Sequence, residues 1–183
     1  MRLKWHAAAL ALIAGISASP LFAAAAATTA AATAVAIAPV QISASLRKAL
    51  HDQYGAAEAA VLQEAVAQRL QRALTGAGAT VSPSAPVRID VSIERAVPSH
   101  PTRYQMQLNP SLDPMRSISL GGAHLHAVLR DADGKPIDEV DYDHFATSLQ
   151  EVSPSADAWS DARVTIERFS DLVVKSWRRH AGR

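Results

Sequence analysis

The chain has 183 residues, with 18 Lys and Arg, 17 Asp and Glu, and no cysteine, so its formal net charge is +1. This near balance of charge argues against a protein that binds nucleic acid through a basic surface. The lack of cysteine excludes structural disulfides, thiol catalysis, cysteine-ligated zinc and an anchor built on a lipid-modified cysteine.

Residues 1–27 have the pattern of a secretory signal peptide. Arg2 and Lys4 make its start basic, and the apolar run 7–16 is too short to cross a bilayer of about 30 Å. We expect cleavage near residues 23–27, which gives a periplasmic or secreted protein with a formal charge of −1 after loss of the two basic residues. The alternative is an N-terminal membrane anchor that stays uncleaved.

After the signal peptide, residues 28–34 contain only alanine and threonine, and we expect this segment to be flexible. Residues 35–183 have the length of a single domain. Its first strand is expected within residues 35–45, either broken at Pro39 or confined to residues 40–45. Proline lacks the N–H that a strand ladder requires, so it suits a strand end or a bulge.

A helix is predicted at residues 55–74, after an irregular stretch or short helical turn at residues 46–54. Every fourth residue of this helix is apolar, which places one apolar stripe along it: Leu62, Val66, Leu70 and Leu74. Residues 87–97 are the clearest strand, because apolar and polar residues alternate along it. Residues 104–108 also alternate, and they either extend this strand or form a short edge strand.

The next strand is predicted at residues 118–129, where the apolar residues change from even to odd positions at Gly121 and Gly122. A β-bulge or a strand end at these glycines would keep the apolar side chains on one face. Residues 131–136, which contain an Asp-Gly pair, then form a turn into a strand around residues 139–143. Pairing the apolar faces of this hairpin requires an even loop, of two or four residues.

A final helix is predicted to begin at Ser153 and Pro154, since serine caps helices and proline suits a first turn. Its apolar stripe is Trp159, Ala162, Ile166, Phe169, Val173 and Trp177. The element order is β-α-β-β-β-α. We therefore predict an α+β fold with a single layer of about four mixed strands and two helices packed on one face.

This element order behind an export signal, with residues 121–142 (GGAHLHAVLRDADGKPIDEVDY) as a polar turn between two strands, resembles small envelope proteins of Gram-negative bacteria. The families are the lipopolysaccharide-assembly lipoproteins, the lipoprotein activators of penicillin-binding proteins and the N-terminal domain of the Tol-system propeller protein. The resemblance covers residues 35–180 and implies a non-catalytic, partner-binding role. Those proteins are mostly lipid-anchored through a cysteine, which this chain lacks.

The long connection at residues 98–116 contains four prolines and is a candidate binding loop. Arg103, Tyr104 and Arg116 are its candidate binding residues, because arginine and tyrosine are enriched at interfaces. The alternative is an ordinary crossover packed by its own apolar side chains.

His124 and His126 share one face of the predicted strand. In a four-residue loop they lie opposite Asp143 and Asp141, and in a two-residue loop opposite Asp141 and Glu139. His124, His126 and Asp141 are therefore candidate zinc or copper ligands. The alternative is a solvated sheet face with cross-strand ion pairs.

Two functions follow from these residues, and neither hypothesis requires an organic cofactor. The first is a non-catalytic exported envelope protein that binds an envelope protein, peptidoglycan or lipid through the exposed sheet face or the proline-rich loop. The second is a small periplasmic metal-binding protein or hydrolase centred on His124 and His126 with Asp141 and Asp143.

Overall fold

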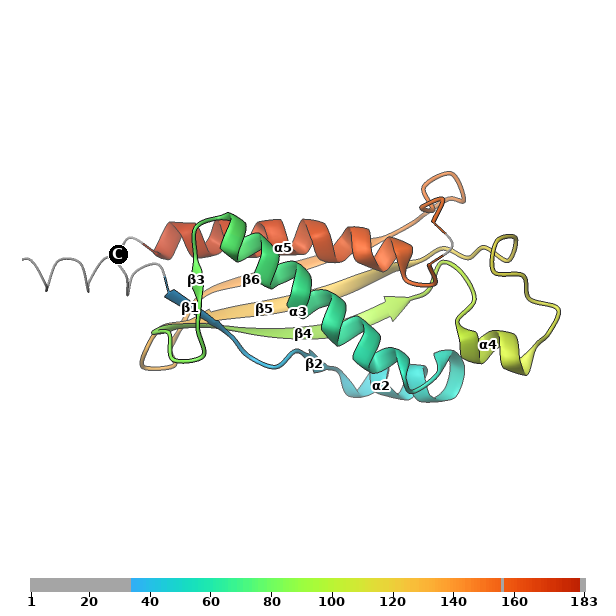
Figure 1. Cartoon of the computed structure of the whole chain (residues 1–183), viewed down its shortest axis with the longest axis horizontal. Helices are drawn as coiled ribbons and strands as arrows, with labels where there is room; N and C mark the ends of the chain where they lie inside the picture. The colour runs from blue at the N-terminus through green and yellow to red at the C-terminus, as the bar shows by residue number, and fades with distance from the viewer. Residues whose placement is uncertain (1–33, 156, 182–183) are drawn as a thin grey trace, which may run out of the picture.

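A computed structural model describes residues 34–155 and 157–181 as an open mixed sheet with two long helices on one face (Figure 1). The predicted signal peptide, and residues 28–33 of the Ala/Thr-rich segment, lie outside the described residues. The strands run in the order β3-β1-β4-β5-β6, and β2 also pairs with β4. Their bounds are β1 Ala34–Ile37, β2 Gln41–Ile42, β3 Thr80–Val81, β4 Val87–Val97, β5 Gly122–Arg130 and β6 Pro136–Phe145.

The predicted α+β class is confirmed, with six strands in place of about four. The helices are α2 Ala44–Ala49, the π-helix η1 Leu50–Tyr54, α3 Glu58–Gly76, α4 Arg103–Leu108 and α5 Ser160–His180. The connection from β1 through α3 to β4 joins parallel strands, whereas β4, β5 and β6 form an antiparallel meander. This is the topology that the element order predicts.

The core lies between the sheet and the two long helices, α3 and α5 (Figure 1). Both predicted helical stripes are buried in it, as are the apolar residues of β4 and the odd-numbered residues of β5. Phe169 and Ile89 are 0% exposed and Trp159 is 1% exposed. Burying a side chain of this size contributes about 1.5–3 kcal/mol, so the shared apolar face holds the helices on the sheet.

The first strand is split, and the chain after it is helical rather than irregular. The backbone leaves the sheet at Pro39 and returns as β2, which pairs with the middle of β4. Leu46 and Leu50 are four residues apart and buried, which gives α2 and η1 an apolar side toward the core. Ser43 caps α2, because its Oγ accepts a hydrogen bond from the backbone N–H of Leu46.

The prediction of a strand at residues 104–108 is wrong, because this piece is the helix α4. Thr102 and Gln105 form a capping box: the Thr102 hydroxyl accepts from the Gln105 N–H at 3.2 Å, and the Gln105 side chain accepts from the Thr102 N–H at 3.0 Å. Two satisfied N–H groups favour a helix start over the extended chain that alternation indicates.

Two strand and helix boundaries also differ from the prediction. β5 begins at Gly122, so the glycines mark a strand end, and the register shift lies in β4 between Ile93 and Arg95. α5 begins at Ser160 rather than near Ser153. The N–H of Ser153 donates instead to the carboxylate of Asp161 at 2.7 Å, which holds the preceding loop against the first turn of α5.

The β5–β6 hairpin has the register of a four-residue loop, with His124 opposite Asp143 and His126 opposite Asp141. Five residues connect the strands, and an extra residue in β6 restores the pairing of the apolar faces. The carboxylate of Asp131 organises the turn, because it accepts from the N–H groups of Asp133 and Lys135.

Candidate functional site

The chain between β4 and β5, residues 98–121, forms one end of the molecule (Figure 1). We call it the distal segment, and it contains the predicted binding loop. Hydrogen bonds fix its base: the N–H of Ser99 donates to Ala158 O at 2.8 Å, and the N–H of Ser119 donates to Ser99 O at 2.9 Å. The distal segment is therefore a long projection on a fixed base.

Helix α4 is attached to η1 at the start of the distal segment. The Thr102 hydroxyl donates to the carbonyl of Tyr54 at 2.7 Å. Tyr104 packs on Gly55, where a Cβ would lie 2.8 Å from the Tyr104 Cβ, and Gly55 has a φ of +106°. A side chain at position 55 would both strain the backbone and displace Tyr104. Tyr104 is half-buried, while Arg103 is exposed.

Beyond α4, the distal segment exposes large aliphatic side chains. Of the eight large hydrophobic residues that are exposed in the described part of the chain, four lie here: Leu108 (65% exposed), Met115 (61%), Ile118 (46%) and Leu120 (43%). Clustered exposed apolar residues mark binding sites more often than single ones do. The loop therefore does not bury its own apolar side chains, as an ordinary crossover would.

A turn around Asp113 presents two of the exposed residues. The Asp113 carboxylate accepts from the N–H groups of Met115 at 2.7 Å and Arg116 at 2.9 Å, and the Asp113 N–H donates to the Ser117 hydroxyl at 3.0 Å. These bonds give the turn a defined backbone. Arg116 is exposed, and neither it nor Arg103 forms an ion pair within residues 34–155 and 157–181.

A pocket of about 410 Å³ lies at the base of the distal segment. Its lining includes Tyr54, His100, Leu112 and Ile118, so η1 and both limbs of the segment contribute. His100 is 4% exposed, and its Nδ1 has no hydrogen-bond partner among the described residues. No sequence signal marks this pocket, because residues from three separate stretches form it.

The open face of the sheet carries the predicted histidine site. The Nε2 atom of His124 lies 3.1 Å from both carboxylate oxygens of Asp141, and the Nδ1 atom of His126 lies 3.3 Å from Asp141 Oδ2. Each histidine side chain is 33% exposed and Asp141 is 59% exposed. Asp143 lies opposite His124 in register, but the carboxylate that meets both imidazoles is that of Asp141.

This arrangement satisfies the imidazoles with one shared carboxylate. Within the described ranges, no group of three or more His, Asp and Glu side chains has a geometry that could hold a metal ion. Pairs of this kind across a sheet contribute about 0.2–1 kcal/mol each. The geometry accordingly fits an ionic contact on a solvated face.

The rest of the open face is paired in the same way. Asp90 accepts from Arg88 at 2.9 Å and from Arg130 at 2.7 Å. The guanidinium of Arg95 lies 3.9 Å from the ring centroid of Phe145. Phe145 in turn covers Gly122, where the φ of +151° and a Cβ 2.2 Å from the His144 carbonyl exclude any larger residue.

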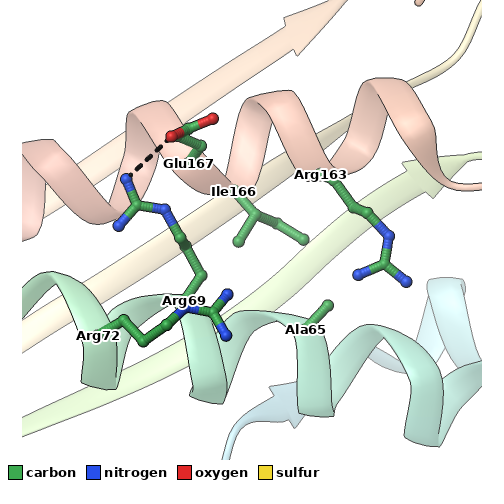
Figure 2. A pocket seen from close by; sticks show the side chains of 6 residues that line it. All are labelled: Ala65, Arg69, Arg72, Arg163, Ile166 and Glu167. Carbon is green, nitrogen blue, oxygen red and sulfur yellow. Dashed lines mark hydrogen bonds and ion pairs between the residues drawn. The ribbon is translucent and has the colours of Figure 1, made fainter. Parts of the chain in front are cut away.

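A further pocket, of about 380 Å³, lies between α3 and α5 (Figure 2). Figure 2 shows the guanidinium of Arg69 directed toward Glu167, at 3.2 Å, and Arg69 also meets Asp171 at 3.0 Å. Arg163 is paired with Asp157 at 2.6 Å. These ion pairs tie α5 to α3 and to the loop before it, and they occupy two of the pocket's three arginines.

No protein-family model matches the chain, and no curated protein matches it significantly. Three solved structures resemble it in part. They are a dodecamer of a PelC variant from Paraburkholderia phytofirmans (11% identity, 76% of this chain and 84% of that chain, TM-score 0.44), a candidate lipoprotein from Caulobacter crescentus CB15 (12%, 86% and 93%, 0.34) and a DUF330 protein from Xanthomonas campestris (11%, 81% and 84%, 0.36).

Likenesses with these TM-scores carry no argument about activity or partners. In the described residues, no helix has the length and apolar character needed to cross a membrane.

Proposed function

We propose that the chain is a non-catalytic exported envelope protein that binds a protein, glycan or lipid partner through the distal segment. The observation that carries this proposal is the exposure of Leu108, Met115, Ile118 and Leu120 on a segment whose base is fixed by hydrogen bonds. Exposed aliphatic side chains contribute nothing to the core, and a partner that covers them gains the free energy of their burial.

The distal segment suits a partner better than the open sheet face does. On the sheet face the charged side chains already meet partners, as Asp141 does with two histidines and Asp90 with two arginines. A partner there would have to replace these contacts. In the distal segment, Arg103 and Arg116 have no such partner among the described residues, and both remain available for recognition.

A second candidate function is divalent-metal binding by His124, His126 and Asp141. It is supported by the convergence of two imidazoles on one carboxylate within 3.3 Å. It requires the two rings and the carboxylate to rearrange around the ion, because no such group is preformed in the described residues.

Site-specific photocrosslinking in the producing cell tests the first proposal. A photoreactive amino acid replaces Leu108 in one variant and Leu172, on the outer side of α5, in the matched control. Leu172 is 37% exposed and lies outside the distal segment. We expect adducts from position 108 and none from position 172. Adducts that form at His126 and not at position 108 would move the binding surface to the sheet face.

A further inference from the structure

We propose that the partner of the distal segment is a membrane surface that contains anionic lipids. In this view Leu108, Met115, Ile118 and Leu120 enter the boundary between headgroups and acyl chains, while Arg103 and Arg116 face the headgroups. The inference rests on the proposed function and names the chemistry of the partner.

The exposed apolar residues fit lipid better than a protein surface. All four are aliphatic, and the single aromatic residue of the distal segment, Tyr104, is half-buried against Gly55. The central contacts of protein interfaces favour tryptophan and tyrosine. Aliphatic side chains that project from a peripheral protein lie about 5–10 Å deep in the membrane boundary without any matching shape.

The charge of the distal segment fits an anionic surface. It holds two arginines and one acidic residue, Asp113, in a chain whose exported form is expected to be slightly acidic. The Asp113 carboxylate accepts two backbone N–H groups of its own turn. Arg103 and Arg116 are exposed and make no ion pair in the described parts of the chain. Basic side chains beside inserted apolar ones strengthen binding to anionic lipids.

The position of the distal segment allows contact with a plane. The segment forms one extreme of the long axis of the molecule, at the right in Figure 1, and α4 lies beyond the ends of α3 and α5 in that view. The polar sheet face and the helix layer therefore need not contact the membrane.

Flotation of the exported chain with vesicles tests the inference. The probes are vesicles of phosphatidylglycerol with phosphatidylethanolamine, and vesicles of phosphatidylcholine alone. We expect flotation with the anionic vesicles, weakened by added salt. The variant Leu108→Ser with Met115→Ser should bind at least about tenfold more weakly, since it removes two inserted side chains. The variant Arg103→Gln with Arg116→Gln should lose most of the preference for anionic vesicles.

The matched control is Val61→Ser with Leu172→Ser, which changes two exposed apolar residues, on α3 and α5. It should float as the unchanged chain does. Each variant should unfold at the same temperature as the unchanged chain, because all these side chains are exposed.

Failure of the unchanged chain to float with anionic vesicles would overturn the inference, as would equal flotation of the Leu108→Ser, Met115→Ser variant. If position 108 then still crosslinks to a protein or glycan, the proposed function stands and only the lipid partner is wrong. If position 108 gives no adduct of any kind, the proposed function fails as well.

Discussion

Replacing Asp138 with asparagine should weaken the attachment of α5 to the sheet in a pH-dependent way. Asp138 lies on β6, and its carboxylate accepts hydrogen bonds from the hydroxyl of Ser176 and, at 2.6 Å, from the guanidinium of Arg179 on α5. The Ser176 hydroxyl, the Arg179 guanidinium and the Glu139 backbone N–H lower the pKa of Asp138 from 3.8 to about 2. Asparagine keeps the shape of this contact and removes its charge.

The magnitude follows from this shift in pKa. A shift of this size corresponds to at most about 2.4 kcal/mol of unfolding free energy at neutral pH, since one pKa unit is about 1.4 kcal/mol. Arg179 is half-exposed, so solvent screening reduces the expected loss to about 1–2 kcal/mol. Because folding lowers this pKa, the contribution is present above about pH 4 and is lost as the pH falls from 4 to 2.

Urea denaturation of both proteins at neutral pH and at several values down to pH 2 measures this difference. The Asp138→Asn variant should be less stable at pH 7, and the two curves should converge in acid. A difference that keeps its size at pH 2, or that is absent at pH 7, would refute the reasoning.

The remaining predictions concern the sheet, the histidines and the processing site. Ile89→Asp should unfold the domain by burying an unpaired charge, whereas Arg88→Ala should change the unfolding free energy by no more than about 0.5 kcal/mol; the opposite order in urea melts would mean that the two sheet faces are exchanged. His124→Ala with His126→Ala should cost little stability, and zinc titration of the unchanged chain should show weak binding; a tight one-to-one titration that disappears in the double variant would make metal binding the leading function. N-terminal sequencing of the exported protein should begin within residues 24–28, and recovery of an intact Met1 would contradict cleavage.

The regular parts of the fold could be predicted because their patterns are long. Four or more repeats of one spacing define the apolar stripes of α3 and α5 and the alternation of β4, and all these residues are buried as predicted. Matching the apolar faces of β5 and β6 was also enough to place His126 opposite Asp141.

Short elements were missed where two local signals competed. In α4 the alternation of Tyr104, Met106 and Leu108 indicates a strand, but the capping box at Thr102 and Gln105 determines a helix. A six-residue piece is too short for its periodicity to decide. The start of α5 depends on a bond from Ser153 to Asp161, which no local pattern contains.

The candidate site was predictable in location but not in detail. The prolines of residues 98–116 indicate a long connection, yet its apolar side chains read equally well as a small packed core. The exposure of Leu108 and Met115 depends on how the turn at Asp113 folds. Likewise, register places two carboxylates near the histidines, but the side-chain rotamers select Asp141 over Asp143.

Hydrogen–deuterium exchange of the exported chain, with and without an extract of the cell envelope, tests the central claim most directly. It reports for every backbone amide whether a partner slows exchange. The account predicts that protection is concentrated in residues 98–121, with little change in β5 and β6. Protection concentrated on residues 122–145, with the distal segment unchanged, would contradict it.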